Sequence, residues 1–278
     1  MGIIRRNFDY IGAPLLAGVF IGLFILETRY QLRKRVQNRL TRVKINLTVA
    51  VPAFILLRVM FLPAMIFLSK RNQTVRTGIS RLLPSSLLRQ VTAFLFLDYT
   101  NYLWHILNHK VPLLWRFHLV HHTDRDLDLT TAFRFHFGEM IGSVFFRGAC
   151  TFLSGARPMT VIIYEIAFEA ATEFHHSNTR LPLGTEQLLN KLIVTPRMHG
   201  IHHSVNARER DSNFSVIFTF WDSLHKTLNL SVHQDDVIIG VPQYQEAKEL
   251  TSGSLLSMPF RSRWLLDRQT SLAGSDHP

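Results

Sequence analysis

The sequence predicts an all-α integral membrane protein in which a cytosolic helical cap holds a histidine-rich di-metal site. Two observations carry this prediction. Apolar runs long enough to cross a bilayer as helices alternate with basic connectors. Ten of the 14 histidines fall into four tight clusters, two of which repeat the spacing H-x-x-H-H. We therefore expect about three to four transmembrane helices, a re-entrant or interfacial hairpin, and the cap.

The first apolar run, residues 11–26, carries no charge. A cleaved signal peptide is the alternative, because Arg5 and Arg6 precede the run, but no cleavage site of small residues follows it. We therefore expect a retained membrane anchor.

Two further apolar runs follow. Residues 45–69 carry one charge, Arg58, and exceed the roughly 20 residues that a helix needs to cross the hydrocarbon core. Residues 87–104 are mostly apolar; Arg89 can snorkel at one end, and Asp98 must face protein rather than lipid. We expect both runs to span the membrane.

Basic residues gather between the first two runs, as the cytoplasmic flank of a membrane helix does. The first span then runs inward, the second outward and the third inward, so that His105 and His109 reach the cytoplasm. No nucleic-acid-binding motif accompanies the net charge of +11, and we expect no nucleic-acid partner. The connector residues are Arg29, Arg33, Lys34, Arg35, Arg39, Arg42 and Lys44.

A fourth apolar segment, residues 140–171, is interrupted by a turn signal at residues 155–158. Each half gives only roughly 22 Å of helix. Arg147, Glu165 and Glu169 add charges that are unfavourable in lipid. We expect a re-entrant or interfacial hairpin, with an ordinary buried helical pair as the alternative.

The histidine clusters have the spacing of metal ligands. H-x-x-H-H places three imidazoles on one face of a helix, within reach of a shared ion. A structural zinc takes about four protein ligands and a catalytic zinc about three, so clusters that offer ten indicate two metal ions. Imidazole suits zinc, copper, iron and nickel alike. The clusters are His105 with His109; His118, His121 and His122; His175 with His176; and His199, His202 and His203.

Other classes of site are excluded or weakened. Cys150 is the only cysteine, which rules out an intrachain disulfide and a thiolate cluster. No dinucleotide fingerprint or P-loop is present, so any reductant must come from another protein. Of two rival functions, a zinc hydrolase lacks its H-E-x-x-H signature. A metal transporter would place its ligands at mid-membrane, whereas the second histidine box continues into the charged residues 122–126.

In combination these motifs resemble the fatty acid hydroxylase and sterol desaturase superfamily of integral-membrane non-haem di-iron oxygenases, and its bacterial-type sterol desaturase proteins in particular. The pattern departs at Phe137 and Gly138, where members often carry Pro and Leu, and at His225 and Lys226, where Phe-Gly is usual. The resembling residues are Asp98, Tyr102, His105, His109, Trp115, Phe117, His118, His121, His122, Asp128, Thr130, Thr131, Arg134, His136, Glu139, His176, Ser177, Asn178, Thr195, Pro196, His199, His202, His203, Asn213, Trp221 and Asp222.

The resemblance implies two irons held by imidazoles, zinc being a possible substitute in the purified protein, and no catalytic residue beyond the ligands. His136 and His175 are additional candidate ligands; for His136 the alternative is a supporting role, oriented by Glu139 or Arg134. Residues expected to support the ligands are Asp98, Glu139 and Asn178, whereas His225, His233 and His277 are expected to be surface residues. The strongest candidate ligands are His105, His109, His118, His121, His122, His176, His199, His202 and His203.

The resemblance also implies an O2-dependent oxidoreductase that hydroxylates or desaturates a C–H bond of a lipid, such as a sterol, a fatty acyl chain or a carotenoid. It implies an external electron donor, either a cytochrome b5-like protein or a ferredoxin with its reductase. The histidine boxes would lie on the cytoplasmic side of a bacterial inner membrane or the endoplasmic reticulum. Phe133, Phe135 and Phe137 are candidates for the wall of a dry lipid slot, with aromatic packing of the bundle as the alternative.

We divide the chain into three parts. Residues 1–97 hold the N-terminal transmembrane helices and the basic connector, residues 98–228 the fatty acid hydroxylase-like catalytic domain, and residues 229–278 a C-terminal tail. The tail carries no motif, and we expect it to be loosely ordered from Ser252 onward.

Overall fold

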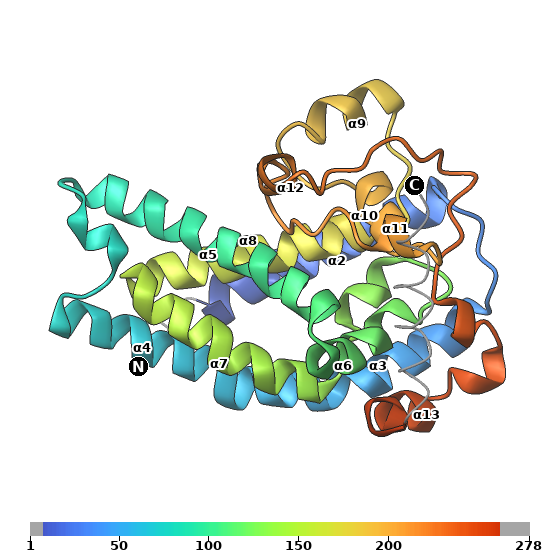
Figure 1. Ribbon diagram of the computed structural model, residues 1–278, viewed down its shortest axis with the longest axis horizontal. Helices are drawn as coiled ribbons and strands as arrows, with labels where there is room; N and C mark the ends of the chain where they lie inside the picture. The colour runs from blue at the N-terminus through green and yellow to red at the C-terminus, as the bar shows by residue number, and fades with distance from the viewer. Residues whose placement is uncertain (1–7, 262–278) are drawn as a thin grey trace.

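The computed structural model describes residues 8–261, which form helices joined by loops (Figure 1). Three isolated β-bridges occur, and within the described residues no strand is formed. The prediction of an all-α protein is therefore confirmed for this part of the chain. Two predictions fall outside the described residues: the surface position of His277 and the state of the tail after residue 261.

Two helices of the described part are long and apolar enough to cross a membrane, and they cover residues 9–29 and 39–82. They contain the first two predicted spans. The third predicted span lies in α5 (Ser86–Lys110); its crossing, and the total number of spans, stay predictions. The elements of the two apolar helices are η1 (Phe8–Gly12) with α2 (Ala13–Arg29), and α3 (Arg39–Leu56), η2 (Leu57–Phe61), α4 (Leu62–Val75) and η3 (Ile79–Leu82).

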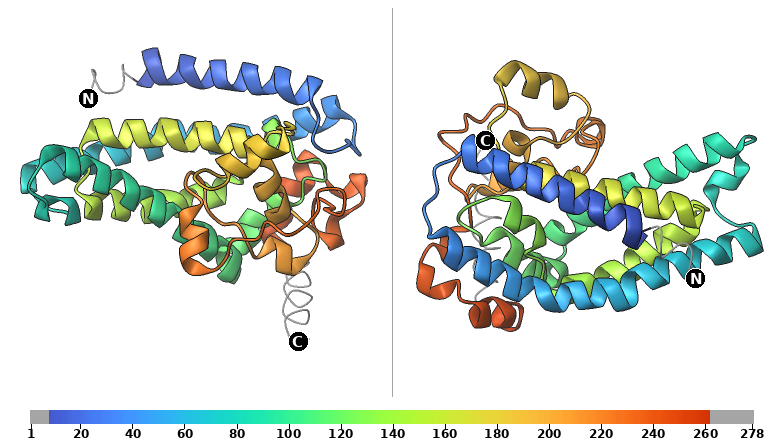
Figure 2. Two further views of the ribbon diagram at one scale, coloured as in Figure 1. Left: turned by 90° about the horizontal axis from the view of Figure 1, so that it is seen from above. Right: turned by 180° about the vertical axis from the view of Figure 1, so that it is seen from behind.

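Helix α2 lies along α8 on the outer side of the molecule (Figure 2). Its apolar side chains are mostly uncovered by protein, and Leu15 and Ile21 are both more than half exposed. A helix that is apolar all round and so little covered by its own chain has the composition of a lipid-facing helix.

The segment predicted as a re-entrant or interfacial hairpin forms two helices, α7 (Phe137–Ser154) and α8 (Pro158–His176), and its position in a membrane stays a prediction. Helix α7 ends at Gly155, whose φ of 73° lies in the left-handed region that glycine adopts without strain. Both helices pack against α4 and α5. Inside the hairpin, Arg147 Nη2 donates to both carboxylate oxygens of Glu165 at 2.7 Å, so these two charges meet each other rather than lipid.

Short helices build a cap over one end of the long helices (Figure 1). Part of the predicted loose tail belongs to this packing, because Leu255 and Met258 are buried in one cluster with Val49 and Trp115. The prediction of a loose tail is therefore wrong for residues 252–261. The cap elements are α6 (Pro112–His122), η4 (Leu129–Phe133), α9 (Leu183–Leu189), α10 (Pro196–His202), α11 (Ala207–Arg210), α12 (Phe220–His225), η5 (Pro242–Tyr244), η6 (Ala247–Glu249), α13 (Ser252–Ser257) and η7 (Met258–Phe260).

The basic connector between α2 and α3 is bound to the cap. Leu32 N donates to Asn178 O at 2.8 Å, and Arg180 N donates to Tyr30 O at 2.7 Å. Arg33 Nη2 donates to Pro196 O at 2.8 Å, at the first turn of α10. The cap therefore lies at the same end of the long helices as the connector.

Candidate metal centre

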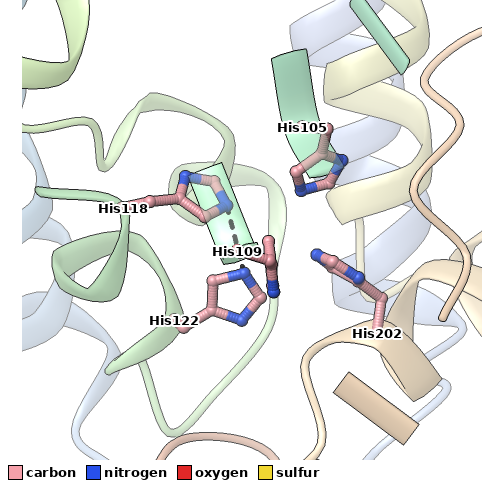
Figure 3. A group of neighbouring side chains, drawn as sticks. All are labelled: His105, His109, His118, His122 and His202. Atoms are coloured by element: carbon pink, nitrogen blue, oxygen red, sulfur yellow. Dashed lines mark hydrogen bonds between the residues drawn. The ribbon is translucent and has the colours of Figure 1, made fainter. Parts of the chain in front are cut away.

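Nine histidines converge in two groups under the cap. Within each group every residue offers one ring nitrogen, and these nitrogens all lie within 4.8 Å of one another. Figure 3 shows the first group, in which rings from α5, α6 and α10 turn toward a common centre. The first group is His105, His109, His118, His122 and His202; the second is His121, His176, His199 and His203.

Each H-x-x-H-H box divides between the two groups. On α6, His118 and His122 are one helical turn apart and enter the first group, whereas His121 enters the second. On α10, His199 and the following His203 enter the second group and His202 enters the first. The spacing along the sequence places the three histidines of a box on one helix face and does not say which ion each one binds. A box lies between the two centres and contributes to both.

The spacing of the facing nitrogens is that of ligands on one ion. In the first group, Nε2 of His122 lies 3.2 Å from Nε2 of His118. In the second group, Nε2 of His176 lies 3.0 Å from Nε2 of His121 and 3.0 Å from Nε2 of His199. Nε2 of His203 lies 3.1 Å from Nε2 of His199. Two nitrogens bound to one ion at about 2.1 Å lie roughly 3.0–3.4 Å apart for ordinary bond angles. The donor positions therefore fit a metal in each group.

The opposite ring nitrogen of several ligands is held by the protein. Nδ1 of His105 bonds to Phe214 O at 2.8 Å, Nδ1 of His202 to Ser212 O at 2.7 Å, and Nδ1 of His176 to Thr172 O at 2.8 Å. A carbonyl only accepts, so Nδ1 carries the proton in each ring and Nε2 keeps its lone pair. These carbonyls select the tautomer that can bind a metal.

Burial favours the neutral imidazole at His122, His202 and His203. Desolvation, followed by the neighbouring histidines, holds the pKa of His122 and of His203 well below 6.5. The same causes lower the pKa of His202. Among the described residues, Nε2 of His202 and Nε2 of His109 are buried and have no hydrogen-bond partner. Neutral rings with unused inward nitrogens are what a metal ion requires.

Two further predicted ligands lie outside both groups. His175 packs beside the second group, its ring centroid 4.1 Å from that of His199. His136 is the N-cap of α7: its Nδ1 accepts from Gly138 N at 3.0 Å, and its Nε2 lies 3.1 Å from Leu256 O. Whether either residue binds a metal stays a prediction.

The three predicted supporting residues have different contacts. A carboxylate oxygen of Glu139 lies 3.1 Å from Nδ1 of His118. Asp98 instead accepts from Trp221 Nε1 at 2.8 Å, and Asn178 bonds to the backbone of Arg33 through both ends of its amide. Glu139 is thus in direct contact with a candidate ligand, whereas Asp98 contacts α12 of the cap and Asn178 contacts the basic connector.

One departure from the family pattern has a steric reason. At Gly138, an added Cβ would collide with the ring of Phe117, the residue before His118. The glycine lets α7 approach α6 closely at the point where Glu139 meets His118. Gly138 is therefore explained by the close packing of α7 on α6 beside the first histidine group.

A buried ionic network behind the site was missed by the sequence reasoning. Arg42 Nη1 donates to Asp124 Oδ2 at 2.7 Å, and Asn46 Nδ2 donates to the same oxygen at 3.0 Å. Arg134 joins through Asn46 Oδ1 at 2.8 Å. Arg42 was counted only as a connector charge. A signal was available in the sequence. Asp124 and Asp128 follow the second histidine box closely, and acidic residues are the partners that a buried arginine needs.

Glu27 was missed for a similar reason. Its side chain is fully buried and accepts from Arg39 Nη2 at 2.6 Å, Leu129 N at 3.0 Å and Asn178 N at 3.0 Å. The carboxylate joins the end of α2 to η4 and to the loop after His176. A charge at the end of an apolar run indicates a membrane boundary, and only the packed structure gives Glu27 these three hydrogen-bond donors and an ion pair with Arg35 at 3.6 Å.

Residues of both histidine groups line one cavity of about 110 Å³. His118, His121 and His199 line one end. Apolar walls from α3, α7, α8 and η4 extend from there, so the space beside the metal ligands is largely dry. The apolar lining includes Ala50, Ala53, Phe54, Leu57, Phe133, Phe135, Met140, Phe168 and Val216.

Phe133 lies at the side of this cavity that faces α2 and α3. Its ring is 5.7 Å from that of Phe20 on α2 and 5.6 Å from that of Phe54 on α3, measured between centroids. Phe54 is 45% exposed on the surface of α3. Of the three phenylalanines predicted for a lipid slot, Phe133 and Phe135 line the cavity, and Phe137 packs on His136.

Comparison with known proteins gives one family and several relatives. Residues 90–227 match the family model described as fatty acid hydroxylase. The alkylglycerol monooxygenase of Danio rerio is 29% identical over 60% of this chain and 36% of its own length. The cholesterol 25-hydroxylase of Rattus norvegicus is 28% identical over 56% of this chain and 52% of its own. The ornithine lipid hydroxylase OlsE of Rhizobium tropici is 28% identical over 54% and 45%.

The matched region thus spans about a third to half the length of these curated relatives. No solved structure matches the chain. The matched residues 90–227 include all nine histidines of the two groups.

Proposed function

This chain belongs to the fatty acid hydroxylase family through residues 90–227, and from that premise we propose that it is a membrane-bound, O2-dependent di-iron enzyme that hydroxylates a C–H bond of a lipid. The observation that carries the proposal is the position of the two histidine groups, which open side by side onto one apolar cavity. Relatives named as lipid hydroxylases support hydroxylation as the reaction. Desaturation begins with the same removal of hydrogen and is the alternative outcome at the same site.

Five imidazoles would hold one iron and four the other. When bound, the two irons supply the O2 activation that breaking an unactivated C–H bond requires, with two electrons delivered from outside. The net reaction consumes RH, O2, two electrons and two protons, and yields ROH and water. An all-nitrogen donor set suits iron, and it suits zinc equally, so zinc can occupy the site as purified.

The chain's own residues orient the ligands and the substrate. The carbonyls of Phe214, Ser212 and Thr172 and the carboxylate of Glu139 hold the outer nitrogens of four ligands. The cavity walls exclude water and confine an alkyl chain beside the inward nitrogens. The protein therefore acts by holding the metals, keeping their surroundings dry, and placing one carbon next to them.

The arrangement of the basic connector supports a cytoplasmic site. The connector is bound to the cap through Leu32, Arg33 and Arg180, and basic connectors favour the cytoplasmic side. If the two apolar helices cross the membrane, the histidine groups then lie at the cytoplasmic surface. A one-electron carrier such as a cytochrome b5-like protein or a ferredoxin can reach them there, and the basic charges of the connector suit an acidic carrier.

The first test is the metal content of the protein purified in detergent after expression with iron-57. We expect about two irons per chain with the Mössbauer signal of a coupled, nitrogen-rich pair. The matched control is His225→Ala, which removes an exposed histidine outside both groups and is expected to retain both irons. One tightly bound metal per chain would contradict the proposal. Loss of iron in His225→Ala would contradict it as well, because His225 lies outside both groups. Reduction under O2 with a lipid panel then identifies the hydroxylated product.

A further inference from the structure

The cavity is polar at the end away from the cap. Glu169 on α8 and Arg147 on α7 line it there, together with Leu57 and Phe168. About two turns of α8 separate Glu169 from His176, which is roughly 10 Å of helix. The cavity therefore joins a metal-binding end to a second polar end through apolar walls.

The charge of Arg147 is already used within the protein. Its Nη2 donates to both oxygens of Glu165 at 2.7 Å, and its guanidinium lies 4.5 Å from the ring centroid of Phe61 and 4.6 Å from that of Phe168. Arg147 and Glu165 therefore form a balanced pair that is held in position by aromatic rings.

Glu169 has no such partner. Among the described residues no hydrogen bond or ion pair is formed by its carboxyl group, and it lines a largely apolar cavity. Leaving a polar group in an apolar site without a partner is unfavourable. Neighbouring acidic residues of α8 differ from it: Glu165 is paired, and Glu173 does not line the cavity. Glu169 is thus a partly exposed carboxyl group on the cavity wall that a ligand can partner.

We propose that Glu169 binds the polar, hydrogen-donating group of the lipid substrate, a hydroxyl or an amine, and so selects which carbon lies beside the metals. This inference rests on the proposed function and adds the substrate class to it. The carboxyl group of Glu169 can accept a hydrogen bond from a hydroxyl or an amine, and with Arg147 balanced by Glu165 the local charge disfavours an acidic headgroup. The roughly 10 Å of helix between Glu169 and His176 sets the reacting carbon about six to ten carbons from the polar group.

The test is a binding measurement that needs no turnover. Trp104 and His105 both line the cavity. A bromine atom on a ligand that enters from the polar end and reaches Trp104 therefore quenches the fluorescence of this tryptophan. The metal-loaded protein, without reductant, is titrated with 8-bromooctan-1-ol and with 1-bromooctane, which lacks the hydroxyl. We expect the alcohol to quench Trp104 with an apparent Kd about threefold to tenfold lower, as one additional hydrogen bond predicts. Trp104→Phe identifies the share of quenching that comes from this residue.

The variants test the role of Glu169. Glu169→Leu is expected to abolish the preference for the alcohol, and Glu169→Gln, whose amide oxygen still accepts, is expected to keep part of it. Glu173→Gln is the matched control on the same helix and is expected to keep all of it. An unchanged preference in Glu169→Leu, with helix content and metal content intact, would overturn the proposal, as would equal binding of the two probes by the unmodified protein.

The same experiment separates this inference from the proposed function. If the preference depends on Glu169 but no lipid is hydroxylated, the subsite stands and the hydroxylase proposal fails. If a lipid is hydroxylated and the probes bind equally, the subsite alone fails. In an active enzyme, Glu169→Leu is further expected to raise KM for the hydroxylated lipid more than it lowers kcat, and to spread the product over several chain positions.

Discussion

Nδ1 of His118 lies 3.1 Å from a carboxylate oxygen of Glu139. The two residues come from α6 and α7, and both side chains are buried. Because the carboxylate orients the ring and makes its other nitrogen a stronger donor, the pair supports the first histidine group from outside.

Glu139→Gln should weaken the metal in the first group by about 10-fold to 100-fold and leave the second group occupied. The measurement is a chelator titration with metal content followed by elemental analysis. Asp98→Asn is the control, since Asp98 bonds to Trp221, and it should release metal like the unmodified protein. Equal metal release from Glu139→Gln and the control would contradict a supporting role.

His121→Ala and His202→Ala should each remove a different metal. His121 belongs to the second group and His202 to the first, so each variant is expected to retain about one ion and to lose turnover, while membrane insertion is unchanged. Mössbauer spectra of the two variants should differ, because the remaining groups offer five and four nitrogens. Two ions in either variant, or full activity, would show that the assignment of that group is wrong.

His136→Ala should keep both metals and lose stability. His136 accepts from Gly138 N as the N-cap of α7, and loss of a cap costs about 0.5–2 kcal/mol. Thermal unfolding measures the loss of stability, and elemental analysis of the same sample measures the metal content. His136→Asn restores an N-cap acceptor and should recover most of the lost stability. Loss of one metal in both variants would instead make His136 a ligand.

The metal-free protein should become less stable as the pH falls below about 6.5. Burial lowers the pKa of His122, His199 and His203 well below that of the unfolded chain. Below pH 6.5 the unfolded state therefore binds protons that the folded state does not, and unfolding is favoured. Thermal unfolding of metal-free protein at pH 7.5 and pH 5.5 measures the effect. An unchanged Tm across this range would mean that these rings are accessible to water.

Much of the architecture followed from local patterns. Apolar runs gave the positions of α2 and α3, and the turn signal at residues 155–158 gave the boundary between α7 and α8. These features depend on neighbours in the sequence, because hydrophobic periodicity and glycine or proline act over one or two helical turns. The prediction of a loose tail is wrong for residues 252–261, because this segment carries no motif and is ordered by contact with distant residues such as Val49 and Trp115.

The sequence by itself determined that this protein has an all-α fold, histidine boxes with metal-ligand spacing, and two apolar helices long enough to span a membrane. Only the tertiary structure decided that each box divides between two groups, that Glu139 reaches His118, and that Glu169 faces the cavity without a partner. Spacing along one helix defines which face a side chain occupies. Which faces meet depends on the packing of helices far apart in the chain, and a local pattern does not contain that information.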